Sequence, residues 1–194
     1  NKHLPYASLN SLAGSHNSSK RVRDQIAWDQ EVKDQAWQYI VKEKILNQAE
    51  CLYKNGRDGY QQLVEYANDV EMGDSTNREG HAAKVYFNCL FGKKWVRGAD
   101  DCVNMSLDYG YSLLLAAVAK EIVANGYITQ LGINHCNEFN EFNLACDLME
   151  PFRPLVDQMI LDISPNSFDI EVKSRLLNFF NQELRYKEAS CYMT

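Results

Sequence analysis

The sequence has no apolar run long enough to cross a membrane, because such a span needs about 18 consecutive apolar residues. The apolar block at residues 113–118 of 194 is far shorter than that. The N-terminus, NKHLP, has neither an initiating methionine nor the apolar core of a signal peptide. We therefore expect no membrane association, and we interpret this end as a cut end rather than a targeting peptide.

The sequence also lacks closely spaced pairs of cysteines. The six cysteines, at positions 51, 89, 102, 136, 146 and 191, include no Cys-x-x-Cys pair. Scattered thiols of this kind are typical of a reduced, cytoplasmic protein, which is the location we expect. A structural zinc site is disfavoured because it uses closely spaced ligand pairs. A nucleophilic pair of His135 and Cys136 is disfavoured because adjacent residues do not easily point their side chains at each other.

The nucleotide-binding and hydrolase motifs GxxxxGK[ST], GxGxxG and GxSxG do not occur. A net charge of −6 argues against a uniformly basic nucleic-acid binder. Basic residues nevertheless gather within 20–23 and 93–97, and local groups of this kind can bind phosphates. Charge clusters are more often simply solvated faces, so both interpretations stay open.

The sequence does contain the periodicity of apolar residues that is typical of helices. Apolar residues recur at spacings of three and four, and no stretch sustains a period of two, which predicts an all-α helical bundle. Residues 1–19, rich in Ser, Asn, Gly and Pro, are expected to form a loop or linker, and residues 20–194 one helical domain. Helices are expected over residues 24–53, 59–70, 78–90, 104–125, 139–149, 155–163 and 168–188.

The same patterns predict buried faces and helix ends. The core residues expected from the first two helices are Ile26, Trp37, Ile40, Val41, Ile45, Ala49, Leu63, Val64 and Ala67. The block 113–118 is apolar on all sides and is expected in the middle of the bundle. One residue of 74–76 is expected to cap the third helix. Pro151 and Pro154 predict a kink or a new helix start near Glu150.

The segment from His135 to Arg153 contains side chains suited to metal chemistry. Asp147 and Glu150 are three positions apart, so a helix would place both carboxylates on one face. A divalent cation would relieve their repulsion. Hard oxygen ligands favour Mg²⁺ or Mn²⁺, and an imidazole from His135 shifts the preference toward Mn²⁺. Spacing alone also fits two ordinary surface acids and a loop histidine.

Three parts of the sequence resemble, in order, the motifs of the CRISPR adaptation integrase. They are NREGHAAKVYF at 77–87, LDYGYSLL at 107–114, and LGINH at 131–135 followed by FNLACDLMEPFRP at 142–154. The residues of these motifs are most similar to those of the integrases of type II systems, and the similarity covers nearly the whole chain. One departure is Asp108, which stands where the family usually has Asn.

The resemblance implies a fold and a metal site. The family has a small β-rich N-terminal domain and a larger helical catalytic domain, and this chain resembles the helical domain alone. The family's metal ligands are a Glu, a His and an acidic residue. Motif by motif these fall on Glu79, His135 and Glu150, with Asp147 as a further acid that supports the site. A histidine ligand must be neutral, so activity is expected to fall below about pH 6.5.

The resemblance also implies a reaction and partners. The family inserts short fragments of double-stranded DNA at the CRISPR repeat by metal-dependent transesterification, and it cleaves DNA when water attacks. It acts as homodimers bridged by a small dimeric partner protein. Candidate phosphate ligands on this chain are Arg78, Lys84, Lys93, Lys94, Arg97 and Arg153. For Arg153, an ion pair with Glu150 or Asp147 is the alternative.

Two other functions stay open at this stage. A non-catalytic helical interaction module would keep the bundle, bind no divalent cation and not depend on Glu79. A helical domain that keeps the family fold but is inactive by itself would bind metal without efficient integration.

Overall fold

The computed structural model describes residues 17–178, 183–186 and 189–192. Its helices are α1 (Ser18–Ile26), α2 (Gln30–Lys54), α3 (Tyr60–Asn68), α4 (Arg78–Phe91), α5 (Cys102–Ala124), α6 (Asn143–Met149), α7 (Arg153–Ile163) and α8 (Ile170–Leu177). Short 3₁₀ helices, η1 (Met72–Asp74) and η2 (Glu150–Phe152), precede α4 and α7. The strands β1 (Glu183–Tyr186) and β2 (Ala189–Tyr192) form an antiparallel hairpin. The predicted all-α class is confirmed, with this hairpin as a small addition.

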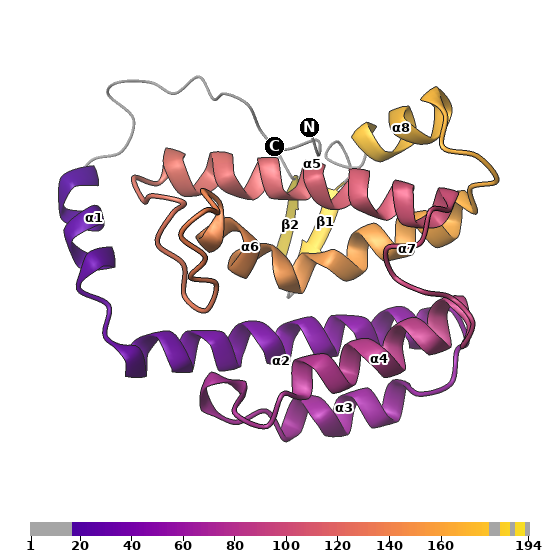
Figure 1. The fold of residues 1–194 in the computed structure, drawn as a ribbon, viewed down its shortest axis with the longest axis horizontal. Coiled ribbons are helices and arrows are strands. Elements are labelled where there is room, and N and C mark those ends of the chain that lie inside the picture. The colour runs from indigo at the N-terminus through magenta and orange to yellow at the C-terminus, as the bar shows by residue number, and fades with distance from the viewer. Residues whose placement is uncertain (1–16, 179–182, 187–188, 193–194) are drawn as a thin grey trace.

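Two layers of helices form the body of the molecule (Figure 1). One layer contains α2, α3 and α4, and the other contains α5, α6, α7 and α8. Each layer has its own apolar core, with Trp37, Ile45, Leu63 and Tyr86 in the first and Leu107, Leu114, Ile160 and Leu176 in the second. Helix α2 joins the layers, because it contacts α3 and α4 on one side and η2 and α7 on the other.

The first predicted helix, residues 24–53, is two helices in the structure. A break follows Ile26, and Asp29 then caps α2 by accepting a hydrogen bond from the backbone N–H of Val32 at 2.8 Å. An N-cap carboxylate satisfies amides that have no partner in the first turn, which is why a new helix starts here. Helix α1 begins at Ser18, inside the predicted linker 1–19, of which residues 1–16 lie outside the described residues.

Two of the predicted core residues are wrong. Ile26 is 65% exposed and Val64 is 39% exposed, whereas the other predicted core residues of α2 and α3 are buried. On α1 the buried side chain is Gln25, whose Nε2 donates to the carbonyls of Ile128 and Leu131 at 2.8 and 2.9 Å. Polar contacts rather than apolar burial therefore attach α1 to the segment that precedes His135.

Glycines and side-chain caps set most helix ends where they were predicted. Helix α2 ends just before Gly56 and α4 just before Gly92, and both glycines have positive φ angles of 59° and 95°. The predicted new start near Glu150 is confirmed, because η2 and then α7 follow α6. Helix α6 begins at Asn143 rather than at Phe139, since the side-chain oxygens of two asparagines accept hydrogen bonds from backbone N–H groups and organise the preceding residues as turns.

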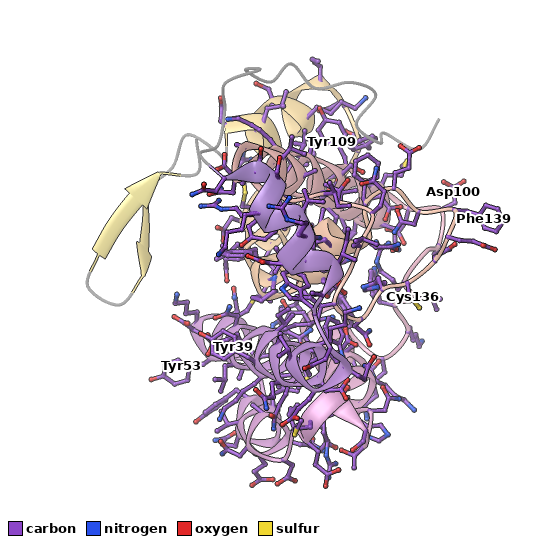
Figure 2. The ribbon with its side chains drawn as sticks, turned by 90° about the vertical axis from the view of Figure 1, so that its left-hand side faces the viewer. Tyr39, Tyr53, Asp100, Tyr109, Cys136 and Phe139 are labelled. Carbon is purple, nitrogen blue, oxygen red and sulfur yellow. The ribbon has the colours of Figure 1, made fainter. Side chains whose placement is uncertain are left out.

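The predicted final helix over residues 168–188 is confirmed only as far as Leu177. Helix α8 ends at Leu177, and β1 pairs with β2 from Glu183 opposite Tyr192 to Tyr186 opposite Ala189. Strands of four residues are too short to show a clear period of two, and their backbone pairing overrides local helix propensity. The hairpin stands clear of the two helical layers (Figure 2).

Helix α5 is buried on one side, not on all sides as predicted. Leu114 and Leu115 are buried, whereas Leu113 and Val118 are half-buried. Its length and mean hydropathy of 1.2 are those of a membrane-spanning helix and equally those of the core helix of a soluble protein. Its contacts with α6, α7 and α8 account for its apolar composition.

Candidate metal centre

Glu79 lies in the first turn of α4, where its backbone is held by two side chains. The carboxylate of Asp74 accepts hydrogen bonds from the N–H groups of Arg78 (2.7 Å) and Glu79 (3.1 Å). Asn77 is the N-cap residue and accepts from the N–H of Gly80 at 3.3 Å. Asp74 confirms the predicted cap, and Asn77 was missed. Together they fix the position from which the Glu79 side chain extends.

His135 lies in the loop between α5 and α6, which a buried Asp147 organises. Asp147 Oδ2 accepts from the N–H groups of Ile133 and Asn134 at 2.6 and 3.1 Å. Its Oδ1 accepts from the backbone N–H of His135 at 3.1 Å and lies 2.6 Å from Nδ1 of the same residue. Asp147 therefore orients the imidazole, as a carboxylate behind a metal-bound histidine does, and leaves Nε2 for a metal.

Close packing also fixes the His135 loop. A Cβ atom on Gly132 would lie 2.2 Å from the carbonyl oxygen of His135 and 2.8 Å from Asp147 Oδ2, so this position needs glycine. The ring of Trp37 on α2 meets the His135 imidazole edge-on, with ring centroids 6.0 Å apart. The imidazole is therefore positioned by both helical layers.

The pKa of His135 is raised above its usual value of 6.5. The hydrogen bond to Asp147 is the largest cause, and the negative charges of Asp147, Glu150 and Glu79 act in the same direction, while partial burial opposes them. The two glutamates therefore lie close enough to this imidazole to favour its protonated form electrostatically.

Glu150 begins η2, and its side chain is only 5% exposed. Arg153 follows one turn later, and its Nε lies 2.8 Å from Glu150 Oε1. The Arg153 guanidinium also lies over the ring of Tyr111, 4.7 Å from the centroid. The ion pair proposed from the sequence as the alternative role of Arg153 is thus present with Glu150.

Lys44 joins Glu79 and Glu150, and sequence reasoning missed it. Its Nζ lies 2.6 Å from Glu79 Oε1 and 2.5 Å from Glu150 Oε2, so carboxylates from α4 and η2 meet at one ammonium group. Lys44 itself is buried, 8% exposed. The sequence did contain a signal, since this lysine lies inside the apolar stripe of α2, next to Ile45 and one turn after Ile40. A lysine at such a position is expected to be buried and therefore to need an acidic partner.

The donor set fits a divalent cation. Two carboxylates and one imidazole suit Mg²⁺ or Mn²⁺. Glu150 Oε2 is buried and close to Lys44 Nζ, yet no donor among the residues that the structure describes reaches it in a direction suitable for a hydrogen bond. A buried carboxylate oxygen without a hydrogen bond is suited to a metal ion. Within the described ranges, however, no three His, Cys, Asp or Glu side chains are already gathered closely enough to bind one.

A buried acid, also missed from the sequence, lies behind the site on α7. Asp157 is 1% exposed and accepts hydrogen bonds from the hydroxyl groups of Tyr86, at 2.8 Å, and Tyr111. Burial raises the pKa of Asp157 to about 6, and the two tyrosines oppose the shift. Tyr111 also lies against Arg153, so this network connects the core between the layers to the Glu150 ion pair.

The candidate phosphate ligands differ in how they are held. The exposed lysines are Lys84, Lys93 and Lys94. Arg78 pairs with Asp69 across 3.5 Å, and Arg97 pairs with Asp108 across 2.5 Å. The lysines are therefore open to solvent, whereas the two arginines already have acidic partners. A role of these side chains in DNA binding stays a prediction.

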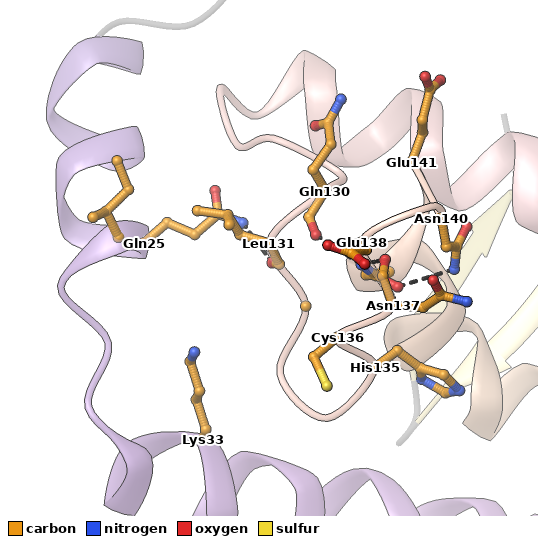
Figure 3. A pocket seen from close by; sticks show the side chains of 13 residues that line it. Gln25, Lys33, Gln130, Leu131, His135, Cys136, Asn137, Glu138, Asn140 and Glu141 are labelled. Atoms are coloured by element: carbon orange, nitrogen blue, oxygen red, sulfur yellow. Dashed lines mark hydrogen bonds between the residues drawn. The ribbon is translucent and has the colours of Figure 1, made fainter.

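A cavity of about 460 Å³ lies beside His135, between α1 and the loop that leads to α6 (Figure 3). Its lining includes Gln25 and Lys33 together with the polar residues of 135–143. Of the three candidate metal ligands, His135 lines this cavity.

Known proteins resemble this chain in sequence over most of its length. The model of the family described as CRISPR associated protein Cas1 matches residues 3–178. The chain is 40% identical over 161 residues to the CRISPR-associated endonuclease Cas1 of Neisseria meningitidis serogroup C (strain 8013), covering 82% of this chain and 51% of that protein. It is 30% identical over 142 residues to a protein of the same name from Pyrobaculum aerophilum, covering 64% and 47%. The chain thus spans about half the length of these relatives.

Solved structures share the fold. A casposase bound to integration product has a TM-score of 0.74 at 17% identity and covers 99% of this chain and 68% of its own. A CAS1 protein from Thermotoga maritima has a TM-score of 0.71 at 21% identity, covering 97% and 68%. A Cas6-RT-Cas1–Cas2 complex has a TM-score of 0.71 at 23% identity, covering 97% and 26%. At these identities the likeness establishes the fold alone.

Proposed function

Because the chain belongs to the CRISPR associated protein Cas1 family, we propose that it is the helical catalytic domain of a DNA integrase. The proposed reaction inserts a short double-stranded fragment into a CRISPR repeat by transesterification, with a 3′-hydroxyl of the fragment as nucleophile. Water in place of that hydroxyl gives endonuclease cleavage. The endonuclease name of the relative at 40% identity supports this proposal, as does the fold shared with a casposase bound to integration product.

The observation that carries the proposal is the convergence of Glu79 and Glu150 on one cation beside His135. These three residues would hold Mg²⁺ or Mn²⁺. When bound, such an ion polarises a phosphoryl oxygen and stabilises the charge that develops on it. Asp147 orients the imidazole, and Arg153 partly neutralises Glu150.

DNA would be held by cations around this centre. The exposed Lys84, Lys93 and Lys94 would contact phosphates of the fragment and of the repeat, which adds affinity without sequence preference. We further propose that the longer protein acts in the cytoplasm as a homodimer with a small dimeric partner. The Cas6-RT-Cas1–Cas2 complex, one of the solved structures that share this fold, supports a Cas2 protein as that partner.

Calorimetric titration with Mn²⁺ tests the metal centre. We expect about one binding site per chain, lost in Glu79→Ala and in His135→Ala because two remaining protein ligands hold a metal weakly. Matched controls are Glu50→Ala and His81→Ala, which remove exposed residues of the same types. The same two site variants should abolish strand transfer in the full-length protein. A chain that binds no Mn²⁺, or binds it equally in all variants, would instead favour a non-catalytic interaction module.

A further inference from the structure

Lys44 is a buried ammonium group between two candidate metal ligands. It lies on α2, in the stripe that contains Val41 and Ile45, both fully buried. Burying a charge costs free energy unless the charge is paired. The two partners, Glu79 and Glu150, come from elements of different layers, so this pair forms only when the layers are assembled.

The charges at this centre already balance without a metal. Lys44 contacts both glutamates, and Arg153 contacts the second oxygen of Glu150. Two positive and two negative side chains therefore face one another. A divalent cation between the same carboxylates would meet strong repulsion from an ammonium that stayed in place.

Arg153 and Lys44 differ in their freedom to move. The Arg153 guanidinium is pinned by its stacking over Tyr111 as well as by Glu150. Lys44 has a flexible four-carbon stem and a compact charge. One turn further along α2 lies Gln48, which is 2% exposed. Its Oε1 is buried and accepts no hydrogen bond from the part of the chain that the structure describes. Residues four apart share a helix face, so Lys44 has an acceptor within one turn.

We propose that Lys44 is a positioning residue that occupies the cation position between Glu79 and Glu150 and withdraws toward Gln48 Oε1 when a divalent cation binds. The inference rests on the proposed metal centre. In the metal-free protein the ammonium keeps the two carboxylates together, so the ligands are preorganised. Its presence also lowers metal affinity, because the cation must displace it. A lysine that stayed in place would also repel the metal, but its effect would not depend on Gln48.

Mn²⁺ affinity of Lys44→Met, measured by calorimetry at one pH, tests this proposal. We expect the affinity to rise on the order of tenfold, because the competing charge is gone. The melting temperature without metal should fall by about 5 °C, because the carboxylates lose their shared counter-charge, and saturating Mn²⁺ should restore it. The control Lys54→Met removes an exposed lysine of the same helix, paired with Glu50 at 2.7 Å, and should change neither value.

A second set of variants keeps the test informative if Lys44→Met folds poorly. Lys44→Arg should fold and bind Mn²⁺ more weakly, because a rigid guanidinium holds both carboxylates and withdraws less easily. Gln48→Met should lower Mn²⁺ affinity about threefold in the parent chain and have no effect in the Lys44→Met background, a coupling that a double-mutant cycle measures.

Failure of the proposed metal centre and failure of the proposed Lys44 displacement give different results. If the parent chain binds no Mn²⁺, the proposed metal centre fails and Lys44 is only a structural ion-pair partner. If the parent binds Mn²⁺ while Lys44→Met binds equally or more weakly, the metal centre stands and the displacement of Lys44 is wrong.

Discussion

Asp147 holds His135 by two bonds at once, accepting from its backbone N–H at 3.1 Å and lying 2.6 Å from its Nδ1. The same carboxylate accepts from two further backbone amides of the loop. One buried side chain thus sets both the path of the loop and the orientation of the imidazole.

Asp147→Ala should therefore lower Mn²⁺ affinity by about 10–100-fold, as the loss of a carboxylate behind a ligating histidine typically does. Calorimetry measures the affinity, and circular dichroism checks that the helices persist. The control Asp162→Ala removes an exposed acid and should leave the affinity unchanged. Parent-like affinity in Asp147→Ala would show that the loop holds His135 without this carboxylate.

Mn²⁺ affinity should decrease on acidification from a higher pH than an ordinary histidine would cause. The hydrogen bond to Asp147 raises the pKa of His135 above 6.5, so the protonated imidazole, which cannot bind metal, persists to higher pH. We therefore expect the decrease to begin above pH 6.5. Titrations between pH 5.5 and 8.5 check this, and a midpoint at or below 6.5 would contradict it. His135→Ala should bind no Mn²⁺ at any pH in this range.

Asp157 should make the protein less stable as the pH rises from about 4 to 6. Its pKa is about 6 in the folded protein, above the 3.8 of a free side chain, so folding favours the protonated acid. The stabilisation is complete below about pH 4 and is lost as the pH rises through 6, amounting to about 3 kcal/mol.

Asp157→Asn should lack this loss. Its free energy of unfolding, measured by urea denaturation, should improve relative to the parent by about 3 kcal/mol between pH 4 and pH 7. The control Asp169→Asn changes an exposed acid that caps α8. A difference between Asp157→Asn and parent that stays constant over this range would show that Asp157 ionises normally.

Asp108→Asn should strengthen DNA binding. Asp108 pairs with Arg97 at the protein surface and stands where the resembled family usually has Asn. Removing its charge frees Arg97 for phosphate, and we expect about a threefold gain in affinity for duplex DNA at fixed salt. Stability should change by less than about 0.5 kcal/mol, because the pair is exposed.

Fluorescence anisotropy with a labelled duplex measures this effect. The control Asp100→Asn removes a charge from the exposed loop that also contains Arg97 (Figure 2) and tests whether any lost negative charge suffices. Equal gains in both variants would assign the effect to net charge, not to Arg97.

Local signals predicted most of the helices. Gly56 and Gly92 ended α2 and α4 where expected, and Asp74 capped α4. These features depend on sterics and hydrogen bonds within one or two turns, so the sequence contains them. The break before Asp29 was missed because Ile26 and Trp37 were assigned to one apolar stripe, although a capping residue was present between them.

The candidate site likewise contains some residues that the sequence predicted and others that only the structure revealed. The resemblance of the sequence motifs pointed to Glu79, His135 and Glu150 as candidate ligands, with Asp147 as a supporting acid, and this assignment stays a prediction. The residues of a motif, however, do not indicate which side chains from other elements face the candidate ligands. Lys44 and Asp157 are ordinary charged residues by sequence, and burial at the junction of the two layers gives them their partners.

By itself, then, the sequence determined the all-α class and the ends of most helices, because these follow from short-range patterns. It also determined the three candidate ligands, because these follow from the residues of the motifs. Only the tertiary structure decided that α1 attaches through Gln25, that residues 183–186 pair with residues 189–192 and that one lysine joins two glutamates. These contacts join segments distant in the chain. Their energies depend on burial and on partners that exist only after the layers pack.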